Sequence, residues 1–135
     1  MSIFAFLRTE WLSVFEAADQ AATAAYSDPR TACFYARRAL ELAVAWLYRH
    51  DSGLKLPYQD HLSALVHEPT FRDTVGPTLH AKVRVIKDLG NLAVHSTKAV
   101  RQIDALMAVR ELFHFGYWLA RTYGRSARPA PGIPF

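Results

Sequence analysis

The apolar residues of this sequence recur at alternating spacings of three and four positions, which is the period of an α-helix. No stretch shows the every-second-residue alternation that a half-buried β-strand needs. The first such series comprises Phe4, Leu7, Trp11, Val14, Ala18 and Ala22. It predicts one amphipathic helix that runs from about residue 4 to Tyr26. With 135 residues the chain can bury one core and is too short for two domains, so we expect a single all-α bundle.

Capping and helix-breaking residues divide the rest of the chain into further helices. Asp28 is expected to cap the second helix, with Pro29 in its first turn, where the missing N–H costs nothing. The next predicted helices cover about residues 29–50, 59–67, 70–75 and 79–95. The last helix is expected to start between Val100 and Asp104, with Asp104 as the candidate N-cap, and to end at Gly124. These segments make four long helices and one or two short ones.

The end of the chain differs in composition from the predicted helical domain, which covers residues 1–124. The last seven residues contain three prolines and one glycine, a composition that precludes a packed helix. We interpret residues 125–135 as a proline-rich linker that leads into a further region of a longer protein.

The charges and the single cysteine limit the functional classes. Residues 1–81 hold seven Lys and Arg against nine Asp and Glu, whereas residues 82–128 hold nine against three, so the two parts carry −2 and +6. The basic part suits an anionic partner such as nucleic acid, although solubility alone also explains it. Cys33 has no partner for a disulfide, and no apolar run reaches the ~18 residues of a membrane span. We therefore expect a cytoplasmic protein without membrane contact.

A polar stripe on the helix before Ser96 is the main candidate site. Its members fall at i, i+4, i+7 and i+11 and are Arg84, Asp88, Asn91 and His95, with Lys87 beside them. A solvated helix face also explains such a stripe. Gly90 costs up to ~1 kcal/mol within a helix, which indicates the close approach of another helix there. His95 at the helix C-terminus could meet a phosphate or carboxylate as a cation.

The second helix carries a small charged group on an otherwise apolar stretch. Arg37, Arg38 and Glu41 are its only charges between residues 32 and 48. Pairing within the helix, at i, i+4 and i, i+3, explains them without further function. The sharper hypothesis is a polar seam, in which Glu41 also orients Arg84 or His95 from the facing helix.

The segment from Ile86 to His95, with its Gly-Asn-x-x-x-His element, resembles the signature of a helical domain of unknown function. That domain stands at the N-terminus of type I restriction enzyme R subunits and related helicases. Residues 36–41 and 104–112 are also similar to it, and the resemblance covers about residues 4–124. It implies an accessory domain whose parent is an ATP-dependent DNA endonuclease or translocase, with a helicase or nuclease region beyond the linker.

That domain is similar in turn to the HEPN superfamily, which implies a bundle of four or five helices that often dimerises. Many HEPN proteins are metal-independent RNases, with an arginine and a histidine separated by four to six residues. Here the corresponding positions are Asp88, Leu89 and Gly90, so the arginine is absent. Arg84 lies eleven residues before His95, about 16 Å along a continuous helix, which is too far for both to hold one phosphate.

Other chemistry has little support in the sequence. His61 and His67 fall on different faces of a short helix, and no metal-ligand motif, phosphate-binding loop or nucleophile elbow occurs. We therefore expect neither a metal nor a cofactor. Trp118 beside Arg121 could face a partner.

Together these observations predict a non-catalytic docking domain with an all-α, HEPN-like fold. Its expected partners are a second copy of itself, other restriction-modification subunits or nucleic acid. The candidate contact residues are Arg84, Lys87, Asn91, His95 and Arg121. The alternative is a HEPN-like RNase or toxin component, with His95 and Asn91 as the candidate catalytic residues.

Overall fold

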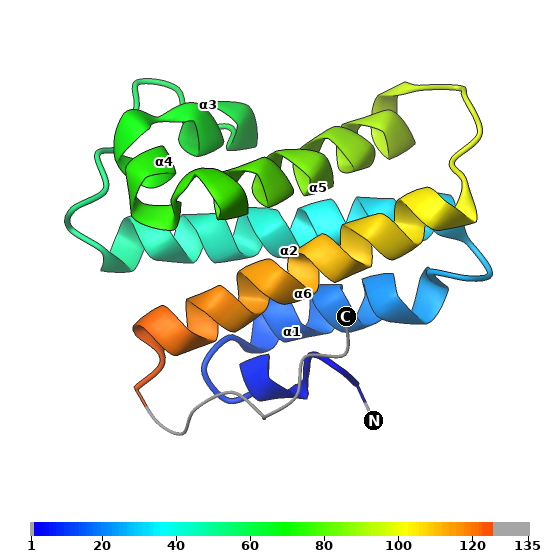
Figure 1. The fold of residues 1–135 in the computed structure, drawn as a ribbon, viewed down its shortest axis with the longest axis horizontal. Helices are drawn as coiled ribbons and strands as arrows, with labels where there is room; N and C mark the ends of the chain where they lie inside the picture. Colours follow the sequence, from blue (N-terminus) through cyan, green and yellow to red (C-terminus); the bar gives the residue numbers. More distant parts are fainter. Residues whose placement is uncertain (1, 126–135) are drawn as a thin grey trace.

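The computed structural model describes residues 2–125, of which 74% are helical and none forms a strand (Figure 1). This confirms the all-α prediction, with four long and two short α-helices in the described part. A short 3-10 helix, η1, precedes them at Ala5–Leu7. The α-helices are α1 (Leu12–Ala24), α2 (Pro29–His50), α3 (Leu62–His67), α4 (Pro69–Val75), α5 (Pro77–His95) and α6 (Gln102–Tyr123).

Helix α2 is the centre of the bundle. It packs against α1, α5 and α6, and Figure 1 shows it running behind α6 and between α1 and α5. A helix with neighbours on several sides must be apolar around most of its circumference. Its buried residues are Ala32, Cys33, Ala36, Ala39, Leu40, Ala43, Val44 and Leu47. The many alanines allow neighbouring helices to approach α2 closely.

The structure of the first segment differs from the predicted continuous helix. The helix expected from residue 4 is interrupted, because η1 ends at Leu7 and α1 begins only at Leu12. Phe4, Leu7 and Trp11 are nevertheless buried. The apolar spacing therefore identified the buried side chains correctly but not the continuity of the backbone. The break at Trp11, with φ of −132°, turns the segment so that Phe4 packs on Phe113 of α6, with ring centroids 6.0 Å apart.

Of the two N-caps predicted from the sequence, the structure confirms one and corrects the other. Asp28 caps α2 as predicted, and its carboxylate accepts a hydrogen bond from the backbone N–H of Thr31. Asp104 was wrongly predicted as the N-cap of α6, because that position is Arg101. Asp104 lies three residues later and accepts from the Arg101 backbone N–H at 3.1 Å. An acidic side chain in the first turn can satisfy a free N–H in this way as well as an N-cap can.

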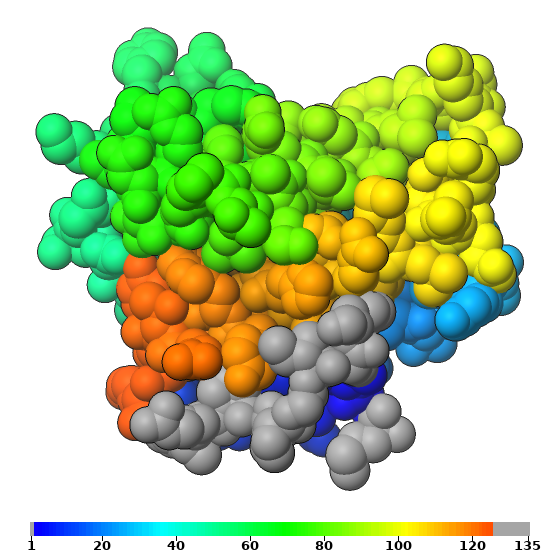
Figure 2. All heavy atoms as spheres, in the orientation of Figure 1, coloured from blue at the N-terminus to red at the C-terminus, as the bar shows by residue number. Residues whose placement is uncertain are grey.

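The short helices α3 and α4 stack beside the start of α5, at one end of the bundle (Figure 1). Figure 2 shows α5 and α6 side by side on one face of the molecule. Within residues 2–125, no helix has the length and apolar character needed to cross a membrane. The linker predicted at 125–135 lies outside the described residues from residue 126 onward.

Candidate functional site

Helices α2 and α5 approach each other closely where Gly90 faces Arg37. A Cβ atom built on Gly90 would lie 2.3 Å from the Arg37 Cβ, so only glycine fits at this crossing. The Arg37 side chain passes over Gly90, and its Nε donates to the Asn91 Oδ1 at 3.0 Å. Its Nη1 donates to Glu41 at 3.1 Å. The close helix approach expected at Gly90 is therefore present, and Arg37 is the side chain that fills it.

The polar seam between α2 and α5 differs in its members from the predicted one. Glu41 contacts Arg37 and Arg38, both in its own helix, at 3.1 and 3.5 Å. Among the described residues, neither Arg84 nor His95 makes a hydrogen bond or ion pair with it. The link across to α5 is instead the Arg37–Asn91 hydrogen bond. Sequence spacing could not show this, because the rotation of α2 against α5 decides which polar groups meet.

The other members of the predicted stripe lie along the outer side of α5. Arg84 and His95 are exposed, at opposite ends of the stripe, and the unbroken helix keeps them far apart. Lys87 pairs with Asp88 at 3.0 Å, and its side chain is only 11% exposed. Asn91, one turn before His95, is half-buried and engaged by Arg37. Asn91 of this stripe thus helps to hold α5 against α2, and the side chains of the stripe do not converge on one point.

Arg30 of α2 holds the C-terminal end of α5. Its Nη1 donates to the carbonyl oxygens of Ala93 and Ser96, at 2.5 and 3.0 Å, and its Nη2 donates to that of Lys98. The last carbonyls of a helix lack partners within the helix and carry partial negative charge. A cation from the neighbouring helix therefore satisfies this end. Sequence spacing gives no sign of this role of Arg30, because its partners are backbone atoms more than sixty residues away.

A buried carboxylate joins α5 to α6. Glu111 is 4% exposed and accepts from Lys82 of α5 at 3.0 Å and from its neighbour Arg110 at 2.8 Å. Burial alone would raise the pKa of Glu111, but the hydrogen bonds and charges of Lys82 and Arg110 hold it below its usual value. Glu111 was not singled out from the sequence. The available signal was its position among the buried residues of α6, between Ala108 and Leu112.

The chain's relation to known proteins rests on one match. A model of the family described as "Domain of unknown function (DUF4145)" matches residues 19–126, which is most of the chain. The chain belongs to the DUF4145 family. The matched range begins within α1 and includes α2 to α6, so it contains the whole contact between α2 and α5. No curated protein and no solved structure matches this chain.

The surface of this DUF4145 domain carries unbalanced positive charge. Between residues 82 and 125 the acidic residues are Asp88, Asp104 and Glu111, and each is paired with a cation of that same region. Arg84, Lys98 and Arg121 make no ion pair with any residue from 2 to 125. They are the cations available to an external anion.

The outward-facing stripe of α6 mixes cations with apolar and aromatic side chains. It follows spacings of four and three and consists of Ile103, Met107, Arg110, His114, Tyr117 and Arg121, of which His114 and Tyr117 are partly buried and the other four are exposed. Ile103 and Met107 are 58% and 37% exposed, which is unusual for large apolar side chains. No group of three or more His, Cys, Asp or Glu in the described part of the DUF4145 domain could hold a metal ion.

Proposed function

We propose that this DUF4145 domain is a non-catalytic docking module of a larger DNA-processing enzyme of the type I restriction R-subunit kind. The observation that carries the proposal is the pairing pattern of residues 82–125, where every acid is neutralised within the region and three cations are left over. Such a surface attracts the phosphate backbone without reading its sequence. The resemblance of residues 86–95 to the R-subunit domain supports the choice of parent enzyme.

The polar residues at the contact between α2 and α5 support a docking role over a catalytic one. Asn91 and Arg37 bind each other, and Arg37 is also paired with Glu41. These groups hold two helices together and are not free to act on a substrate. The exposed Ile103 and Met107 on α6 provide an apolar area that fits a second copy of the domain or another subunit.

Binding of labelled duplex and single-stranded DNA at several salt concentrations tests the nucleic-acid contact. We expect weak binding that falls linearly with salt on a logarithmic scale, because bound phosphate releases counterions. The double variant Lys98→Ala, Arg121→Ala should reduce that slope by about two if both side chains contact phosphates. Arg49→Ala, which removes an exposed cation at the far end of α2, is the matched control.

Absence of binding at low salt would exclude the nucleic-acid contact and leave protein docking. Light scattering then measures whether the domain self-associates, with Ile103→Lys as the variant that should abolish it. The parent enzyme is tested separately by reading the genomic frame on the 3′ side of the Phe135 codon for helicase motifs.

A metal-independent RNase is the alternative function, and one observation favours it. Arg37 reaches Asn91 from α2, so a guanidinium lies beside the position one turn before His95. This cation could replace the arginine that the helix itself lacks. The ion pair between Arg37 and Glu41 weighs against that role, because Glu41 already neutralises the charge of the guanidinium.

A further inference from the structure

The described part of the molecule contains an open pocket of about 520 Å³ between α3, α4 and the start of α5. The volume falls within the usual range for small-molecule sites. Each of the three helices contributes at least one side chain that is, or can become, a cation. The charged and titratable lining residues are His67, Arg72, Asp73, His80 and Arg84, and Gly76 and Pro77 complete the wall.

Two imidazoles of the pocket are held in place by backbone carbonyls. His80 is 7% exposed, and its Nε2 lies 2.8 Å from the carbonyl oxygen of Val66. His67 places its Nδ1 2.8 Å from the carbonyl oxygen of Ser63. A carbonyl oxygen only accepts, so each of these nitrogens carries the proton. The second nitrogen of each ring carries a lone pair in the imidazole and an N–H in the imidazolium, so it can accept from or donate to a bound phosphate.

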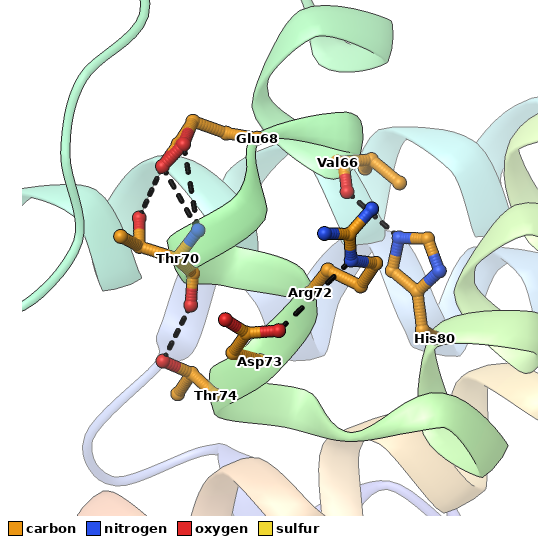
Figure 3. Close-up of polar contacts among 7 residues, drawn as sticks. All are labelled: Val66, Glu68, Thr70, Arg72, Asp73, Thr74 and His80. Carbon is orange, nitrogen blue, oxygen red and sulfur yellow. Dashed lines mark hydrogen bonds and ion pairs between the residues drawn. The ribbon is translucent and has the colours of Figure 1, made fainter.

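The two arginines of the pocket are weakly engaged by the protein. Arg72 approaches Asp73 only to 4.0 Å, with both side chains more than half exposed. Figure 3 shows Arg72 extending from α4 toward the His80 ring of α5. Arg84, one turn after His80 on the same face, has no hydrogen bond or ion pair with any described residue. Two arginines against one aspartate leave a net charge of +1 before either imidazole is counted.

The start of α5 adds to this positive field. Its N-cap is Gly76, which provides no capping side chain, and its first turn holds no acidic residue. The first N–H groups of a helix point out of its end and carry partial positive charge. Gly76 and Pro77 line the pocket, so this end of the helix borders it.

We propose that this pocket binds a phosphate monoester, held by Arg72, Arg84, His67 and His80. Guanidinium groups bind phosphate oxygens through paired, charge-assisted hydrogen bonds, and the pocket has room for a mononucleotide. The same group occurs in a free nucleotide and at the 5′ end of a nucleic-acid strand. The pocket shares Arg84 with the docking surface, but the proposal does not depend on the docking function, because His67, Arg72 and His80 take no part in that surface.

Isothermal titration of the full chain with inorganic phosphate, with adenosine 5′-monophosphate and with adenosine tests the proposal at constant ionic strength. We expect the monophosphate to bind and adenosine to be at least tenfold weaker. Arg72→Gln and Arg84→Gln should each weaken binding about tenfold or more, since each removes a charge-assisted contact. The controls Arg49→Gln and Arg8→Gln remove exposed cations outside the pocket and should bind as the wild type does.

Short single strands with and without a 5′-phosphate distinguish the two sources of the ligand. Tighter binding of the phosphorylated strand than of the mononucleotide assigns the pocket to a strand end, and the reverse order assigns it to a free nucleotide. The proposal is overturned if phosphate and the mononucleotide do not bind at millimolar concentration. It is also overturned if the control variants weaken binding as much as the pocket variants do.

Discussion

Gly90 of α5 lies directly against Arg37 of α2, and a methyl group on the glycine would lie 2.3 Å from the arginine Cβ. A Cβ atom is fixed to the backbone, so it cannot rotate out of the way as a side-chain end can. The two helices would have to move apart to admit any other residue. The Arg37–Asn91 hydrogen bond, which crosses the same interface, would be strained by that movement.

Gly90→Ala is therefore expected to destabilise the domain by about 1–3 kcal/mol, although alanine is the better helix former. Chemical denaturation followed by circular dichroism measures the change. Gly116→Ala in α6 is the matched control, because its new methyl group would meet only side-chain ends, those of Leu7 at 3.3 Å and Phe6 at 3.8 Å. A Gly90 variant as stable as the wild type would contradict the close approach.

Because of its hydrogen bond with Arg37, Asn91 should contribute more to the free energy of unfolding than Asp88, which lies on the same helix face. Asn91→Ala should cost about 0.5–1.5 kcal/mol, because it leaves the half-buried Arg37 Nε without its acceptor. Asp88→Ala, on the same stripe but with a 69% exposed side chain, should cost less than about 0.5 kcal/mol. Equal losses in denaturant titrations would mean that the Asn91 contact contributes nothing specific.

The lowered pKa of Glu111 predicts acid sensitivity. Because its pKa in the folded state lies below the unfolded value of about 4.3, the ionised group stabilises the fold at neutral pH. That contribution is lost as the pH falls through the folded-state pKa. The melting temperature should thus drop more steeply below pH 5 in the wild type than in Glu111→Gln. Glu16→Gln, at an exposed position, should keep the wild-type slope, and a parallel decline in all three proteins would refute the prediction.

Cys33 is expected to be chemically inert in the folded domain. It is fully buried on α2, and burial raises the pKa of its thiol to about 11. Reaction requires the thiolate, so Ellman's reagent at pH 8 should modify it only after unfolding in guanidinium. A Ser13→Cys, Cys33→Ala variant carries its thiol at an exposed position and should react at once. Rapid reaction of the native wild type would show that this part of the core opens readily.

The RNase alternative predicts a different result from the docking function. We expect no cleavage of structured or unstructured RNA in EDTA, because the residue one turn before His95 is the neutral Asn91 and the charge of Arg37 is paired with Glu41. Loss of one electrostatic stabiliser typically costs 10²–10³-fold in rate. Cleavage that disappears in both His95→Ala and Arg37→Ala would establish the enzyme and overturn the docking function.

The sequence by itself determined the all-α class, the long helices and the buried residues of the first segment. Helical periodicity and caps are local properties, so the Asp28 cap and the burial of Phe4, Leu7 and Trp11 could be predicted from neighbouring residues alone. Gly90 indicated a close helix contact in the same way. A glycine within a helix lowers its stability, and the close packing of a second helix can offset that loss. The prediction of one continuous first helix was wrong, because the spacing of apolar side chains carries no information about the backbone turn at Trp11.

Only the tertiary structure decided which polar groups meet. Arg30 reaches the end of α5, Arg37 reaches Asn91, Lys82 reaches Glu111, and the lining of the pocket is assembled from α3, α4 and α5. These partners lie far apart in the chain, and their distances depend on how each helix is rotated and shifted against its neighbours. That rotation is set by the sum of many apolar contacts between helices, so it cannot be derived from the spacing of residues along one helix.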